Sequence, residues 1–234
     1  MTRIAIIAGS AEARALARAI PQAEVRLVSP ERVAQSWPAA VSTGALEPSW
    51  IAETGAEMVI EAAHPCDIET AQAAARLARA EGLPLLQLVR PAWRAGARDR
   101  WHRLRSPEKA AEVIPKGARV LMAAGRDALV RMQALEAYVI ARRIGQGGED
   151  RFPLRRGRFQ TKQGPFTVAE EMRALRKDRI DWLLVHNAGG PGGWPKLGAA
   201  RRLGLPVAMI DRPRRPDGPR VQTVAEALAW IAKQ

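Results

Sequence analysis

Two histidines stand where an α/β protein places groups that do chemistry. His64 and His186 each follow an apolar run that is expected to form a strand, and an imidazole can transfer a proton near neutral pH. They are candidate proton donors, although a histidine can equally hold a loop by hydrogen bonding. The three histidines are spread along the chain and Cys66 is the only cysteine, so no metal site or intrachain disulfide is expected.

Glycine-containing loops are the second chemical feature. The first expected strand of each half is followed by loop 9–12 or loop 125–128, and loop 187–193 holds four glycines. Glycine lets the backbone approach a ligand closely, and the helix N-terminus behind such a loop favours phosphate groups. Neither first loop completes a G-x-G-x-x-G fingerprint, so an ordinary strand-to-helix turn is an equal alternative for both.

The second expected strand of each half ends without an acidic residue. The first half reads Val28-Ser29 at this point and the second reads Arg142-Arg143. An Asp or Glu at this position holds the ribose of NAD, whereas basic groups suit the 2′-phosphate of NADP. If a nicotinamide cofactor binds, the sequence favours NADP.

The elements that must position these residues alternate between short β-branched strands and amphipathic helices, a pattern typical of parallel sheets covered by helices. We expect strands at 3–8, 24–28, 40–42, 57–61, 85–89, 101–104, 119–123, 138–143, 181–185 and 207–210. We expect helices at 10–20, 48–54, 67–80, 127–136, 167–177, 195–203 and 224–232.

The two halves of the chain resemble each other. Segment 82–91 parallels segment 204–213 with both prolines in register, and His64 falls on His186 at the same offset. The sequence therefore predicts two similar α/β domains, 1–94 and 118–234, joined by a basic linker, 95–117.

The charge is concentrated in three segments. The chain of 234 residues has a net charge of +13, and segments 90–105, 142–162 and 201–220 each hold six arginines. An anionic partner is therefore expected. No apolar run is long enough for a membrane span, and the N-terminal run is too short for a signal core, so we expect a cytoplasmic protein.

Several motifs, in their order and spacing, resemble the precorrin-6A reductase family of cobalamin biosynthesis over nearly the whole chain. They lie at 6–14, 61–65, 164–171, 185–190, 196–201 and 204–213. The family's glycine loop typically reads Lys-x-Ser-Gly-Gly, and His186 and Ala188 replace its Lys and Ser here. A role that needs that Lys or hydroxyl does not transfer, whereas backbone roles of the glycines do.

The resemblance implies two Rossmann-like, flavodoxin-like domains with a ligand cleft between them, and an NADPH-dependent reduction that converts precorrin-6A to precorrin-6B. The substrate carries a rim of carboxylates, which arginine binds bidentately. The expected cofactor-binding residues are Gly9, Ser10, Ala11, Ser29, Arg32, Gly125, Arg126, Asn187, Gly189 and Gly190. The expected substrate-binding residues are Arg90, Arg94, Arg142, Arg143, Lys196 and Arg212.

Three questions stay open at this point. The proton could come from His64, from His186 or, as we favour, from water or the substrate itself. A nucleic-acid binder is the main alternative on charge alone, although the basic segments carry few aromatic residues and no helix-turn-helix, RRM or OB pattern is seen. Another NADP-dependent reductase or a transferase on the same scaffold is the second alternative. A monomer is favoured over an oligomer.

Overall fold

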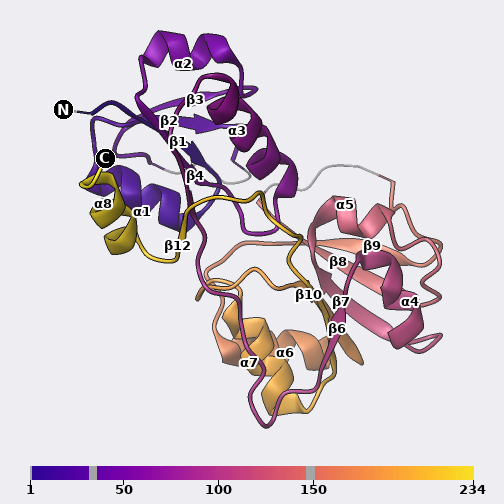
Figure 1. The fold of residues 1–234 in the computed structure, drawn as a ribbon. Coiled ribbons are helices and arrows are strands. Elements are labelled where there is room, and N and C mark those ends of the chain that lie inside the picture. The colour runs from indigo at the N-terminus through magenta and orange to yellow at the C-terminus, as the bar shows by residue number, and fades with distance from the viewer. Residues whose placement is uncertain (1, 32–35, 146–150) are drawn as a thin grey trace. The chain divides into compact units, whose positions relative to one another are not determined.

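The computed structural model describes residues 2–31, 36–145 and 151–234 (Figure 1). The strands are β1 (Ile4–Ala8), β2 (Glu24–Leu27), β3 (Ala40–Thr43), β4 (Met58–Ala62), β5 (Leu85–Leu88), β6 (Trp101–Leu104), β7 (Arg119–Ala123), β8 (Tyr138–Ile144), β9 (Gly157–Lys162), β10 (Trp182–His186), β11 (Val207–Ile210) and β12 (Arg220–Val221). The helices are α1 (Ala11–Ala19), α2 (Pro48–Thr54), α3 (Ile68–Ala80), the short 3-10 helix η1 (Pro107–Lys109), α4 (Ala110–Val113), α5 (Gly125–Val130), α6 (Val168–Lys177), α7 (Trp194–Leu203) and α8 (Val224–Ile231).

The chain divides into two compact units. Unit 1 is formed by residues 1–91 and 213–234, and unit 2 by residues 92–212. Each holds one six-stranded sheet, in the order β3-β2-β1-β4-β5-β12 in unit 1 and β9-β8-β7-β10-β11-β6 in unit 2. All described strand pairs are parallel. Both orders are the 3-2-1-4-5-6 order of a Rossmann fold, which confirms the predicted fold class.

Each sheet is buried between two layers of helices, because successive side chains of a strand point to opposite faces. In unit 1, α1 and α8 cover one face and α2 and α3 the other. In unit 2, α4 and α5 cover one face and α6 and α7 the other. Figure 1 shows α8 beside α1 and α7 beside α6. The layers of the two units therefore correspond helix by helix.

Side-chain caps fix where several helices begin. The hydroxyl of Ser10 accepts the Ala13 N–H at the start of α1. Thr167 and Glu170 form a capping box at α6, and Thr223 and Glu226 form one at α8. Such caps satisfy backbone N–H groups that the first turn leaves without a partner. The turns between strand ends and helices are thereby held at defined residues.

The two sequence repeats exchange their sixth strands. After β5 the chain leaves unit 1, and β6 pairs with β11 in the sheet of unit 2. After β11 it returns, and β12 pairs with β5 in the sheet of unit 1. The helix after each exchanged strand, α4 or α8, packs on the same sheet as that strand. Each sheet is therefore completed by a strand and a helix from the other sequence repeat.

This exchange explains why the units differ from the domains expected from the sequence. The repeat ends near residue 117, whereas the units meet at residues 91–92 and 212–213. The expected linker, 95–117, contains β6 and α4 and belongs to unit 2. The expected C-terminal domain loses residues 213–234 to unit 1. The repeat in the sequence is correct, but its edges are not the edges of the folded units.

Smaller differences concern single elements. The helix expected at 127–136 is the shorter α5, which ends at Val130. Strand β9 was not expected, because Gly157–Lys162 has little apolar alternation and lies at a sheet edge. Strand β12 was not expected either, since two residues carry no periodic pattern.

Substitution in α8 tests whether this C-terminal helix supports unit 1. Ala227 is fully buried between α8 and the sheet. We expect Ala227→Asp to lower the free energy of unfolding by about 3 kcal/mol, because it buries an unpaired carboxylate. Denaturant unfolding measures the change. The control is Ala225→Asp, at an exposed position of the same helix, which should stay within about 0.5 kcal/mol of the parent. Equal effects of the two would contradict the packing.

Candidate functional site

The expected site residues of unit 1 lie at one edge of its sheet. Gly9 follows β1, Ser29 lies just beyond β2, His64 follows β4 and Arg90 follows β5. Because the strands are parallel, their carboxyl ends share one edge, where open α/β sheets bind ligands. Arg32 lies outside the described residues.

The loop after β1 is packed against the loop after β4. A Cβ atom built on Gly9 would lie 3.2 Å from the Cα of Ala63 and 3.2 Å from the N of His64. The Ser10 hydroxyl donates to the Ala62 carbonyl oxygen at 2.7 Å. Glycine is therefore needed at position 9 by the neighbouring backbone, and Ser10 serves both as helix cap and as a tie between the loops.

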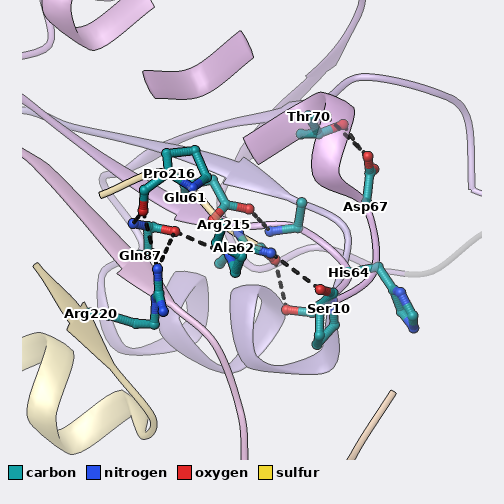
Figure 2. Close-up of polar contacts among 12 residues, drawn as sticks. Ser10, Glu61, Ala62, His64, Asp67, Thr70, Gln87, Arg215, Pro216 and Arg220 are labelled. Atoms are coloured by element: carbon teal, nitrogen blue, oxygen red, sulfur yellow. Dashed lines mark hydrogen bonds and ion pairs between the residues drawn. The ribbon is translucent and has the colours of Figure 1, made fainter. Parts of the chain in front are cut away.

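His64 is half-buried and its ring is oriented by its own loop. The Nδ1 atom accepts the N–H of Cys66 at 3.3 Å. A neutral imidazole that accepts at Nδ1 carries its proton on Nε2. Figure 2 shows the ring directed away from the polar contacts around Glu61. The ring can therefore present an Nε2–H group at the ligand-binding edge of the sheet.

The glycine loop after β10 is held by three anchors within unit 2. The Asn187 side chain accepts from the N–H of Trp93 at 2.8 Å and donates to its carbonyl oxygen at 3.1 Å. The Trp93 indole donates to the Gly190 carbonyl oxygen at 2.9 Å. Arg212 donates to the carbonyl oxygens of Asn187 and Ala188 at 2.7 and 3.0 Å. The loop is therefore fixed by both segments that connect the units.

Glycine is required at several points of the unit 2 edge. Gly125, Gly189 and Gly190 have φ values of 83°, 69° and 74°, a region that other residues rarely adopt. A Cβ atom built on Gly125 would meet no atom of the described residues within 4 Å. The backbone after β7 therefore borders open space, as a loop that receives a ligand should.

His186 is half-buried at the end of β10. Burial lowers its pKa, and contact with the backbone of Ala124 only partly offsets this. Among the described residues, none hydrogen-bonds to its buried Nδ1 atom. The ring is therefore neutral at pH 7 and holds no additional proton to donate.

Arg142 is bound to Glu171 inside unit 2. Its Nη1 donates to both carboxylate oxygens of Glu171, at 2.6 and 2.7 Å, and the two side chains are 3% and 2% exposed. The half-buried Lys196 donates to the Gly193 carbonyl oxygen at 3.2 Å, and burial lowers its pKa. The Arg142–Glu171 pair joins β8 to α6, and the expected substrate role of Arg142 stays a prediction.

The remaining expected substrate-binding residues differ in their contacts within the protein and in their exposure. Arg90 pairs with Glu12 at 2.7 Å and so ties the end of β5 to the first turn of α1. Arg143 lies over the ring of Phe159, with its Cζ 3.2 Å from the centroid. Arg94 is exposed. Arg90 and Arg212 thus hold elements together, and Arg94 is the most accessible of these groups.

Three residues, two in unit 1 and one in unit 2, were missed by the sequence reasoning. Glu61 and Arg215 form a buried pair beside the His64 loop, and Trp93 anchors the glycine loop. The signal for Glu61 was present, because a charge inside the apolar run Met58–Ala62 requires a partner. No local pattern marks the partner, which lies 154 residues away.

The remaining expectations concern metal sites, membrane spans, the cleft between the domains and the oligomeric state. The described residues contain no group of three or more His, Cys, Asp or Glu side chains that could hold a metal ion. Within the described ranges, no helix is long and apolar enough to cross a membrane. The cleft between the domains and the monomeric state stay predictions.

Comparison with known proteins gives a consistent result. The model of a family described as precorrin-6x reductase CbiJ/CobK matches residues 3–232. The precorrin-6A reductase of Rhodococcus erythropolis is 35% identical, over 99% of this chain and 98% of that protein. The precorrin-6A reductase of Rhodobacter capsulatus is 31% identical, over 99% and 96%. A solved structure of a CobK precorrin-6A reductase has a TM-score of 0.90 and 30% identity, covering 100% of this chain and 97% of that one.

The half-buried His186 should make stability depend on pH. Its folded-state pKa lies below the usual value of 6.5, so below pH 6.5 the unfolded chain binds a proton that the folded chain does not. Stability from this group is therefore present above pH 6.5 and lost as the pH falls toward the folded pKa. We expect His186→Gln to flatten the dependence of Tm on pH between about 7.5 and 5.5. An unchanged slope would show that the ring titrates normally.

Proposed function

This chain belongs to the CbiJ/CobK family of precorrin-6x reductases, and we propose that NADPH is its hydride donor. It reduces precorrin-6A in cobalamin biosynthesis, as an oxidoreductase that acts on a carbon–carbon double bond. A reductase of this family implies a nicotinamide cofactor. The choice of NADPH over NADH rests on the residues at the strand ends.

The observation that carries this choice is the basic end of β8. Arg142 and Arg143 are adjacent there, and Arg142 is committed to Glu171. Arg143 lies on the face of Phe159 and places its positive charge where a Rossmann fold holds the adenine ribose. No acid replaces it at the strand tip. The position suits the 2′-phosphate of NADPH, so we assign Arg143 to the cofactor rather than to the substrate.

The backbone at the same edge fits a pyrophosphate. The Gly125 loop borders open space, and Gly189 and Gly190 turn the next loop through positive φ values without adding side chains. Gly9, in contrast, is filled by the backbone of Ala63 and His64. We therefore assign the pyrophosphate to unit 2, where Gly125, Arg126 and the glycine loop would hold it.

The chain's own contribution to the reaction is mainly positional. When bound, NADPH supplies the hydride. Asn187, Trp93 and Arg212 fix the glycine loop that would orient it. Holding the two reactants in the correct orientation removes much of the entropic part of the activation barrier. No side chain of the protein needs to form a covalent bond with the substrate.

Proton delivery is assigned to His64 or to water that it orders. The ring is half-exposed and its accepting Nδ1 directs Nε2–H outward. His186 is the weaker candidate because its ring already hydrogen-bonds to the backbone of Ala124 and its Nδ1 atom is buried. Arg94 is the exposed member of the expected substrate-binding set, and its guanidinium can bind a substrate carboxylate bidentately.

The direct test is turnover of precorrin-6A with each nicotinamide cofactor. We expect conversion to a product heavier by two hydrogens with NADPH, and kcat/KM with NADH lower by about a hundredfold. Mass spectrometry of the tetrapyrrole and loss of absorbance at 340 nm measure the two. Equal use of NADH would contradict the cofactor proposal.

Arg143→Gln tests the residue assigned to the 2′-phosphate. We expect kcat/KM with NADPH to fall about tenfold to a hundredfold, because a charged hydrogen bond is lost, while the value with NADH stays the same. Arg158→Gln is the matched control, since Arg158 lies on the adjacent strand β9 and pairs with Asp178 at the surface. A parallel loss with both cofactors would instead indicate a general defect.

A further inference from the structure

Unit 1 buries a charged cluster that the reaction itself does not explain. Glu61 of β4, Gln87 of β5 and Arg215 are 0%, 1% and 7% exposed. Glu61 and Gln87 are register partners on adjacent strands, and Arg215 lies three residues beyond the point where the chain leaves unit 2. A buried charge is strongly unfavourable unless it is paired and hydrogen-bonded, so Glu61 makes unit 1 dependent on Arg215.

The guanidinium of Arg215 hydrogen-bonds to three partners at once. Figure 2 shows Arg215 together with Glu61 and Gln87. Nη2 donates to Glu61 Oε2. Nε donates to Gln87 Oε1 at 3.1 Å, and Nη1 to the carbonyl oxygen of Pro65 at 3.4 Å. A single side chain therefore joins two strands to the loop that carries His64.

Glu61 extends the same set of contacts toward the ligand-binding edge. Its Oε1 accepts the N–H of Ala63 at 2.9 Å, two residues along the chain. The carbonyl oxygen of Ala62 accepts the Ser10 hydroxyl, and Gly9 lies against Ala63 and His64. Three hydrogen bonds therefore fix the backbone from Ala62 to Pro65. Two of them, to the Ala63 N–H and the Pro65 carbonyl oxygen, come from the buried pair.

The use of charges here calls for a reason other than stability. Well-packed apolar residues of similar volume in place of a buried ion pair often leave a protein equally stable or more stable. What apolar residues cannot do is hold two backbone groups, the Ala63 N–H and the Pro65 carbonyl, at defined positions. The directional bonds therefore specify the path of the loop.

We propose that Glu61 and Arg215 are positioning residues, which hold the His64 loop in the arrangement that the reduction uses. This rests on the role assigned above to the His64 loop. Arg215 belongs to the second sequence repeat and enters unit 1 together with the exchanged strand. It orders a loop that belongs to the first repeat. Neither residue contacts the reacting atoms.

The test removes both charges together. In Glu61→Leu/Arg215→Met the volume is kept and no charge is left unpaired, so Tm should stay within about 5 °C of the parent. Each single substitution leaves its partner charged and should lower Tm by about 10 °C. The double variant therefore separates the positioning of the loop from the stability of the fold.

Two measurements on the double variant decide the proposal. Hydrogen–deuterium exchange of the backbone amides 62–67, without cofactor or substrate, should speed up by about tenfold or more, because local order is lost. The kcat for precorrin-6A should fall about tenfold to a hundredfold. Arg220→Met is the control, since Arg220 contacts Gln87 and the Pro216 carbonyl oxygen but neither Glu61 nor Pro65. It should leave both values as in the parent.

The outcomes are distinct from those of the cofactor proposal. Unchanged exchange in the double variant would overturn the positioning role, and so would faster exchange with full turnover, because the reaction would not need the ordered loop. Equal use of NADH by the parent would contradict the assignment of NADPH. That result would leave the exchange measurement, made without cofactor, unaffected.

Discussion

The burial of Glu61 is the constraint on which much of unit 1 depends. A carboxylate in the interior of a parallel sheet requires a cation, and among the described residues its ion-pair partner comes from the other sequence repeat. Arg215 is that partner only because the chain returns to unit 1 after building unit 2. The arginine of the ion pair, the added strand β12 and the helix α8 that covers the sheet all come from this returning segment.

The two segments that connect the units share a design. Each connecting segment has two anchoring side chains, three residues apart. One binds a residue of unit 1 and the other binds a residue of unit 2. Arg90 binds Glu12 in unit 1, and Trp93 holds the glycine loop of unit 2. Arg212 holds that same loop, and Arg215 holds the loop after β4. The connections thus end on the loops that are expected to bind ligands, so each of these loops is anchored by a connecting segment.

The sequence allowed the repeated order of strands and helices to be predicted, and with it the edge at which the candidate residues gather, because periodicity and the strand-to-helix turns are local signals. The exchange of sixth strands could not be predicted, since β12 has only two residues and pairing partners are not encoded locally. The contacts of the arginines could not be predicted for a similar reason. A cluster such as 201–220 indicates charge, but only the fold shows that Arg212 and Arg215 bind groups within the protein.

The exchanged strands also set the order in which the two units can be completed during synthesis. Domains usually fold as they emerge, from the N-terminus onward. Here unit 2 is continuous and has all its strands once residue 212 has been made, whereas unit 1 waits for the last 22 residues, 213–234. Until then, β5 is an open sheet edge and Glu61 has no counter-charge. The unit that begins the chain is the last to become complete, so a nascent chain that stalls near its end carries a finished second unit and an unfinished first one.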